Sequence, residues 1–191
     1  LGCTEIDLLV GPADAAVPTR QDLEPSPALS IVVKGPKRFE GRKLGILVTD
    51  GVDAKLLKGI MAAIETESAV YELIAPKVGG VTASDGSWVE AHHMIDGGPS
   101  VLFDAVVLLT STEAIDDLVM EATARDFVAD AFQHCKFIGY DSSAVKLLEK
   151  AGIADALDEG VIMLPGEDGI AGFVFGLGKL RVWGREPSVK L

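Results

Sequence analysis

The sequence predicts a three-layer α/β/α sandwich with a mainly parallel sheet, preceded by an extended arm. From residue 43 onward, short apolar segments alternate with amphipathic helical segments, and this alternation is typical of α/β domains. The expected strands are apolar throughout, as are strands covered on both faces. Five of the nine prolines lie in the first 40 residues, where they disfavour regular structure. We therefore predict an extended proline-rich linker over 1–42 and one domain over 43–191.

The individual elements follow from local patterns. We expect strands at 43–49, 69–76, 104–110, 136–140 and 160–164, and helices at 54–67, 114–134, 143–152 and 168–182. The first helix places Leu57, Ile60 and Ile64 on one stripe. Over 80–93, two short extended segments flank an Asp-Gly pair, which predicts a β-hairpin. In such folds ligands bind outside the carboxyl ends of the strands, so the site is sought there.

The charge of the chain restricts its partners. The chain has 191 residues and a net charge of −12, and residues 1–42 carry 6 acidic and 5 basic residues of the 29 and 17 in total. Nearly all the negative charge therefore belongs to the predicted domain. An acidic surface repels phosphate backbones and anionic lipids, so nucleic acid and membrane partners are not expected.

The two ends and the cysteines give few signals. The first residues, LGCTEIDLLV, lack the positive region of a secretory signal and an initiator Met, which suggests a fragment or a processed form. No apolar run approaches the length of a membrane span. Cys3 and Cys135 form no paired motif, and Cys135 is interpreted as a small buried hydrophobic residue.

The stretch KFIGYDSSAVKLLEKAGI (136–153) predicts a strand, an abrupt turn and a helix. Hydrolases of α/β type place a nucleophile at such a turn, so Ser142 and Ser143 are candidates. A serine nucleophile needs a base, and only three histidines exist: His92 and His93 would face opposite sides of a strand, and His134 ends a helix. Asp and Ser are also preferred helix N-caps, which is the interpretation we favour here.

Other segments predict structure rather than chemistry. The glycine-rich segment after residue 165 is not a phosphate-binding loop, and Gly169, Gly172 and Gly176 share one helical face, which favours close helix packing. Acidic pairs at 116–117 and 167–168 suit helix starts. No residues have zinc or calcium spacing, so neither a metal nor a bound cofactor is expected.

The elbow sequence resembles the class I glutamine-amidotransferase-like superfamily, in the branch of intracellular proteases. The superfamily pattern A-x-C-H-G-x-x-x-L-x-x-A-G is followed by YDSSAVKLLEKAG through its last residues. The resemblance implies a flavodoxin-like fold, with Ser142 at the position of the catalytic cysteine, Ser143 at that of its histidine and Asp53 at that of the acid. A Cys-His pair replaced by Ser-Ser lacks both the low-pKa thiolate and its partner, so we expect a degenerate site without catalytic residues.

The two ends resemble a second, narrower family. The segments SPALSIVVKGPKRFEGRKLGILVTDGVD and GLGKLRVWGREPSVKL are similar to the C-terminal extension of large-subunit haem catalases. This resemblance covers nearly the whole chain and implies a parent enzyme that decomposes hydrogen peroxide to water and oxygen. It places the haem in a core domain of that parent, since Tyr71 and Tyr140 have no haem-ligand motif around them. It also implies contacts with that core and with neighbouring subunits of a homotetramer.

Two classes of function therefore remain. The first is a non-catalytic accessory domain that stabilises a catalase, with ATP-independent holdase activity toward unfolded clients when isolated, because the chain is apolar (mean hydropathy +0.32) yet strongly acidic. The alternative is a small hydrolase or glyoxalase-type enzyme that uses Ser142 with Asp53. A base within hydrogen-bond reach of Ser142 would discriminate between them.

Overall fold

The chain consists of two units in the computed structural model, which describes residues 13–20, 22–35 and 37–189. The first unit covers residues 1–35 and the second residues 36–191. The described part of the first unit contains one short helix, α1 (Ile31–Lys34), whose cap Ser30 accepts a hydrogen bond from the Val33 amide. The second unit includes Phe39, which is 1% exposed, so buried packing begins before the expected strand at 43.

The second unit is built on a six-stranded parallel sheet. The strands are β1 (Lys43–Val48), β2 (Val70–Ala75), β5 (His93–Met94), β6 (Ala105–Leu109), β7 (Ile138–Tyr140) and β8 (Val161–Met163). Their order is β5-β2-β1-β6-β7-β8, and every pairing is parallel. The fold class predicted from the apolar strands is confirmed. Because β2 and β6 lie on opposite sides of β1, the strand order reverses between β1 and β6.

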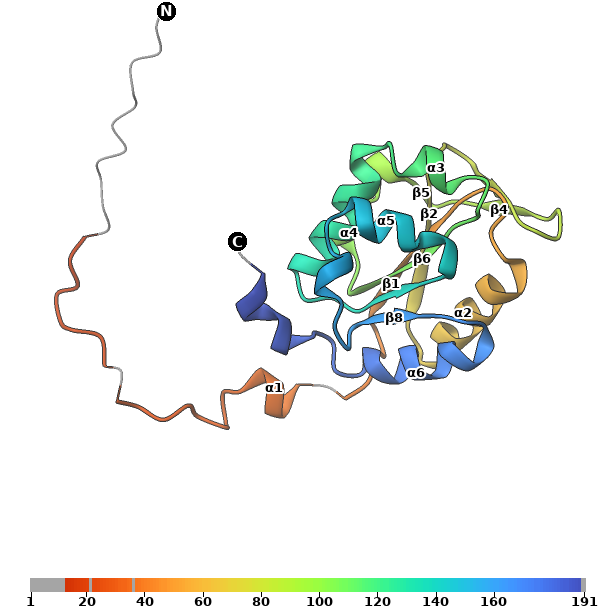
Figure 1. Cartoon of the computed structure of the whole chain (residues 1–191). Helices are drawn as coiled ribbons and strands as arrows, with labels where there is room; N and C mark the ends of the chain where they lie inside the picture. Colours follow the sequence, from red (N-terminus) through yellow and green to blue (C-terminus); the bar gives the residue numbers. More distant parts are fainter. Residues whose placement is uncertain (1–12, 21, 36, 190–191) are drawn as a thin grey trace, which may run out of the picture. The chain divides into compact units, whose positions relative to one another are not determined.

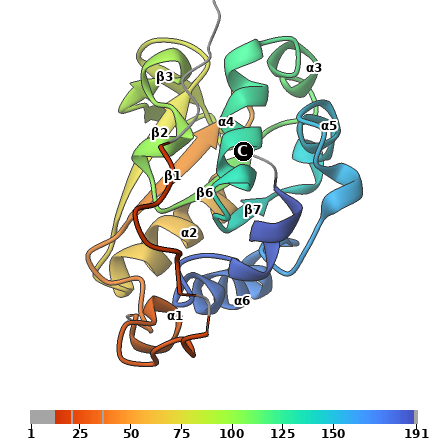
Figure 2. The same cartoon turned by 90° about the vertical axis from the view of Figure 1, so that its left-hand side faces the viewer.

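Helices cover both faces of this sheet (Figures 1 and 2). Helices α2 (Ala54–Thr66) and α6 (Glu167–Leu177) pack on one face, and α3 (Ile115–Leu118), α4 (Ala122–Gln133) and α5 (Val145–Lys150) pack on the other. Alternate residues of β1 supply the two cores: Ile46 belongs to the α2 side and Leu47 to the α4 side. No helix among the described residues has both the length and the apolar character needed to cross a membrane.

The predicted hairpin is present as a separate two-stranded sheet. β3 (Gly80–Thr82) pairs antiparallel with β4 (Trp88–Glu90). The turn between them has Gly86 at φ +81°, a conformation that glycine adopts without strain. The chain then returns to the main sheet as β5, which the sequence analysis included in the hairpin segment.

The prediction of one helix over 114–134 is wrong. The chain leaves helical geometry at Glu121, which has an extended conformation (φ −75°, ψ 125°) and precedes α4. Arg125 donates a 2.8 Å hydrogen bond from Nη1 to the Val119 carbonyl, at the end of α3. That bond satisfies a terminal carbonyl and stabilises the break, although apolar residues continue with helical spacing on both sides.

The last two helices also differ from their expected bounds. The helix expected at 143–152 starts as a 3₁₀ turn, η3 (Ser142–Ala144), continues as α5, and gives way to Gly152 at φ +75°. The helix expected to reach residue 182 ends at Leu177. Leu180 then has a positive φ of 65°, and the chain forms a second 3₁₀ segment, η5 (Trp183–Ser188).

Candidate functional site

The elbow lies at the carboxyl end of β7, as the strand–turn–helix pattern predicts. Asp141 follows the strand and is the N-cap of η3, because its carboxylate accepts the Ala144 amide at 3.0 Å. The apolar strand IGY is buried on both faces, while α5 buries Leu147 and Leu148 against the sheet. Burial of these two elements therefore fixes the position of the turn between them.

Asp141 is the centre of a small hydrogen-bond network. Its Oδ1 accepts from the Ser143 hydroxyl at 2.7 Å, and its Oδ2 accepts from the Thr110 amide at 2.8 Å. The Thr110 and Ser143 hydroxyls are 3.0 Å apart. Burial raises the pKa of the Asp141 carboxyl, and the hydrogen bonds from Ser143, Ala144 and Thr110 oppose that rise. The network joins the carboxyl ends of β6 and β7.

Ser142, which the sequence analysis expected at the position of the superfamily cysteine, does not share this network. Its side chain is exposed, and its hydroxyl makes no hydrogen bond to the described residues. The nearby carboxylate bonds Ser143 instead. A hydroxyl without a base or an orienting group is a poor nucleophile.

Asp53 caps a different helix. It precedes α2, and its Oδ1 accepts the amides of Lys55 at 2.8 Å and Leu56 at 3.0 Å. The structure thus brings Ser143 together with Asp141 through a direct contact, whereas the hydrogen bonds of Asp53 all lie within its own helix start. Asp53 is occupied as a cap in the way that aspartates at this position commonly are.

The three histidines lie away from the elbow. The His92 ring accepts the Leu73 amide on Nδ1 at 2.9 Å, and His93 Nε2 lies 2.7 Å from Glu72 Oε2. Strand β5, which contains His93, is four places from β7 in the sheet order, or roughly 19 Å at about 4.8 Å per strand. His134 follows α4, before β7 starts, and so lies at the opposite end of β7 from the elbow.

A cavity of about 450 Å³ opens at the same end of the sheet, beside the elbow rather than in it. It lies between the segments that follow β1, β2 and β6, and Asp50, Lys77 and Glu113 are among its lining residues. Neither Ser142 nor Ser143 lines it. The elbow serines and the cavity are therefore separate features of the carboxyl edge.

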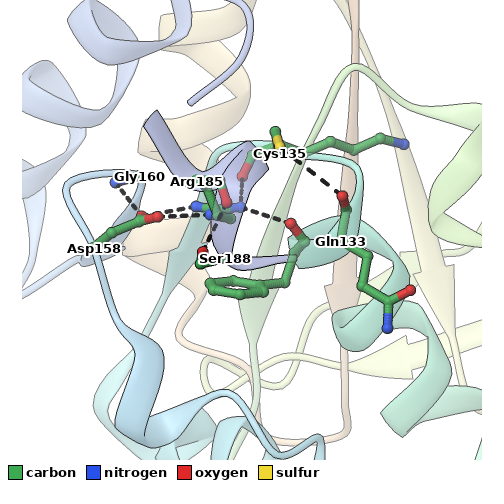
Figure 3. Close-up of polar contacts among 8 residues, drawn as sticks. Gln133, Cys135, Asp158, Gly160, Arg185 and Ser188 are labelled. Carbon is green, nitrogen blue, oxygen red and sulfur yellow. Dashed lines mark hydrogen bonds and ion pairs between the residues drawn. The ribbon is translucent and has the colours of Figure 1, made fainter. Parts of the chain in front are cut away.

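A second polar centre lies at the opposite end of the sheet, where β7 and β8 begin (Figure 3). Arg185, on η5, is 2% exposed and forms a two-pronged ion pair with Asp158, with distances of 2.7 and 2.8 Å. Its Nη1 donates to the carbonyls of Phe132 and Lys136, and its guanidinium lies 4.1 Å from the centre of the Phe132 ring. We call Arg185, Asp158, Phe132 and Lys136 the Arg185 cluster.

Lys136 is the second buried cation of this cluster. It is 3% exposed, and its Nζ donates to the Ser100 carbonyl at 2.6 Å. Burial lowers the pKa of Lys136 to about 8, and Arg181 lowers it further, against Asp104 and Asp130. The Ser100 hydroxyl has no hydrogen-bond partner among the described residues. The sequence analysis missed this cluster because Arg185 lies in a short polar segment without apolar periodicity.

The described residues give little support for a metal site or for a reactive cysteine. Among the described residues, no three or more His, Cys, Asp and Glu side chains converge to hold a metal ion. Cys135 is free and 6% exposed, and burial raises the pKa of its thiol. A buried thiol with a raised pKa is a weak nucleophile, in keeping with a packing role.

Comparison with known proteins identifies relatives along almost the entire chain. The chain is 67% identical to Catalase C of Rhizobium meliloti over 186 residues, which is 97% of this chain and 26% of that protein. It is 30% identical to Catalase HPII of Pseudomonas putida over 170 residues, 88% of this chain and 23% of that protein. The chain thus spans about a quarter of the length of these relatives.

Solved structures with the same fold are more distant in sequence. A DJ-1 superfamily protein from Salmonella typhimurium matches with a TM-score of 0.61 and 17% identity over 78% of this chain and 100% of that one. Oxidised DJ-1 from Toxoplasma gondii matches with a TM-score of 0.58 and 13% identity over 78% of this chain and 94% of that one. These matches confirm the expected superfamily fold.

The family is established by a match to the complete domain. The family model described as the C-terminal domain found in long catalases matches residues 40–187. That range begins beside the buried Phe39 and ends within η5, so it includes the whole sheet and the Arg185 cluster. The chain belongs to the family of C-terminal domains of long catalases.

Proposed function

We propose that this chain is a non-catalytic accessory domain that stabilises a large haem catalase, whose core decomposes hydrogen peroxide. The observation that carries the proposal is the elbow. Ser142 is exposed and has no base in hydrogen-bond reach among the described residues, while Ser143 donates to Asp141, which caps the start of the helix. The family assignment supplies the parent enzyme, and the core domain and the neighbouring subunits of a homotetramer are the proposed partners.

Haem does not fit the residues that the structure describes. None of the residues that line the cavity is a His, Cys, Met or Tyr. Tyr140 is 6% exposed and packs within the apolar core on the α4 side, and the His92 and His93 rings are engaged by Leu73 and Glu72. We therefore propose that the haem is held entirely by the catalase core, and that this domain carries neither a cofactor nor a metal.

The test is a truncation of a long catalase that contains this domain. Removal of residues corresponding to 36–191 should lower the temperature of inactivation or change the peroxide kinetics. A matched control is the full-length enzyme with Arg185→Met, which perturbs the domain without removing its surface. If the truncated enzyme equals the full-length one in both thermal inactivation and kinetics, the accessory role is wrong.

A holdase activity of the isolated domain is the second part of the proposal. Several large apolar side chains are strongly exposed, among them Phe175 and Val78, each at 83%, Met120 at 75% and Trp88 at 63%. Exposed apolar groups bind unfolded segments, and the charge of −12 opposes further aggregation. No phosphate-binding loop exists in the sequence, so ATP is not required.

The holdase test is a light-scattering assay on a heat-labile client enzyme. The chain should suppress aggregation at a several-fold molar excess, and the double variant Phe175→Ser with Trp88→Ser should suppress it less. An inert acidic protein of similar charge is the control. Equal suppression by that protein would reject the holdase activity and leave the accessory role untouched.

The hydrolase or glyoxalase alternative has no observation in its favour. It requires Ser142 to act with Asp53, and Asp53 bonds the Lys55 and Leu56 amides. The carboxylate at the elbow, Asp141, bonds Ser143. Among the described residues, the alternative therefore lacks an activated nucleophile at the elbow.

A further inference from the structure

The cavity at the carboxyl edge lies where α/β sheets bind ligands. Its walls come from the segments after β1, β2 and β6, so it spans the point between β1 and β6 at which the strand order reverses. Open parallel sheets bind small molecules at such points. Its volume of about 450 Å³ lies within the usual range for small-molecule sites. Position and size therefore both favour a ligand, independently of any charge.

The charged groups of the cavity select the class of ligand. Four carboxylates line it, from Asp50, Glu113, Asp117 and Glu121, against one base, Lys77. Two of these carboxylates interact with nearby groups of the protein. Asp50 accepts the Thr82 amide, and the pKa of the Glu113 carboxyl is lowered, chiefly by its own backbone amide and then by Thr112. A cavity with this excess of carboxylates attracts cations and repels anions.

Asp117 and Glu121 are the two carboxylates without such partners. Neither side chain makes a hydrogen bond or an ion pair with the described residues, although both backbones do make hydrogen bonds. Glu121 is half-buried, and burial raises the pKa of its carboxyl, with Asp96 and Asp117 adding to the rise and Lys77 opposing it. They lie one helical turn apart in the sequence, at α3 and at the start of α4. The break between those helices therefore places both carboxylates on the cavity wall.

An organic cation suits these walls better than a metal ion. No three carboxylates among the described residues converge on a point that could hold a metal, so the negative groups surround a volume instead. Between them lie apolar groups of Pro76, Val81 and Leu118, which can contact a carbon skeleton. Small-molecule sites commonly combine an apolar lining with a few placed polar groups.

We propose that this cavity binds a small organic cation that carries a primary ammonium or a guanidinium group. Asp117 and Glu121 contact the cationic group, and Pro76, Val81 and Leu118 contact its carbon chain. This inference goes beyond the accessory role and does not depend on it, because the cavity lies wholly within this domain.

The experiment is a calorimetric titration of the 191-residue chain with agmatine, which carries both groups, at low ionic strength. Saturable binding of one agmatine per chain is expected. The double variant Asp117→Asn with Glu121→Gln should weaken it about tenfold or more, because two charged contacts are lost. Unfolding by urea shows in parallel that the variants are folded. Ala114→Leu, which adds volume at a lining position, should also weaken binding.

The matched control separates a site from general charge. Asp126→Asn with Glu149→Gln removes the same two charges from exposed positions on α4 and α5, outside the cavity. Its affinity for agmatine should remain that of the wild type. Absence of saturable binding, an equal loss in both double variants, or displacement of agmatine by an equimolar amount of Ca²⁺ would each overturn the proposal.

Discussion

The two ends of the sheet handle their polar groups in opposite ways. At the carboxyl end, Asp141 and Asp53 accept backbone amides at helix starts, and four other carboxylates line a cavity. At the amino end, Arg185 is buried and pairs with a carboxylate, two carbonyls and an aromatic ring. The carboxyl end is where related folds place chemistry, yet the most completely bonded side chain lies at the other end. We infer that the Arg185 cluster contributes more to stability than either carboxylate cap at the other end of the sheet.

The largest effect is expected from Arg185→Met. The substitution leaves Asp158 without its cation and the Lys136 carbonyl without a donor, and the Phe132 carbonyl keeps only the Cys135 amide. Loss of one partner of a buried pair commonly costs about 3 kcal/mol or more, and Asp158 is partly exposed, so we expect about 3 kcal/mol in urea unfolding. Lys146→Met, which breaks an exposed pair with Asp116, should cost less than about 0.5 kcal/mol. A loss below about 1 kcal/mol at Arg185 would contradict the comparison.

The next effect is a pH dependence that Lys136→Met removes. The folded pKa of Lys136, about 8, lies below its ordinary value of 10.5, so the unfolded chain binds the proton more tightly. The stability that neutral Lys136 contributes is therefore fully present above pH 10.5, and it is lost as the pH falls from there through about 8. The wild type should gain about 2 kcal/mol from about pH 7 to about pH 9.5 relative to the variant. Parallel stability curves for the two proteins would show that Lys136 titrates normally.

Local signals in the sequence account for much of the fold. The apolar runs correctly predicted the central strands, and Gly152 correctly predicted the end of a helix, since both depend on residues within a few positions. The break at Glu121 was missed because apolar spacing continues from α3 into α4, and the Arg125–Val119 bond that stabilises it leaves no periodic signal.

The position of the candidate site could be predicted from the sequence, but the hydrogen-bond partners of its residues could not. The strand–turn–helix pattern places the elbow candidates at Ser142 and Ser143, directly after Asp141 in the chain. The contacts that decide its chemistry are distant: Thr110 is 31 residues from Asp141, and Arg185 is 27 residues from Asp158. Pairings over such separations depend on strand order, which composition and periodicity do not give.

A smaller effect separates the two carboxylate caps at the carboxyl end. Asp141→Ala should cost about 2 kcal/mol, because it removes a helix cap, leaves the Thr110 amide unpaired and leaves the Ser143 hydroxyl with the Thr110 hydroxyl alone. Asp53→Ala removes only a cap and should cost about 1 kcal/mol. The Asn variants, which keep an accepting oxygen, should recover most of each loss in urea unfolding. Equal costs for the two alanine variants would mean that the Asp141 network adds nothing to a plain cap.

The smallest effect is expected at Ser142. Its side chain is exposed and unbonded among the described residues, so Ser142→Ala should change the free energy of unfolding by less than about 0.5 kcal/mol. Ser143→Ala, which removes the 2.7 Å bond to Asp141, should cost about 1 kcal/mol and is the matched comparison. Any hydrolysis of an ester or a 2-oxoaldehyde by the chain should also be the same in Ser142→Ala and in the wild type. An activity that disappears only in Ser142→Ala would identify Ser142 as a working nucleophile. The carboxyl end of the sheet would then be catalytic, and its serines would have a role beyond the start of a helix.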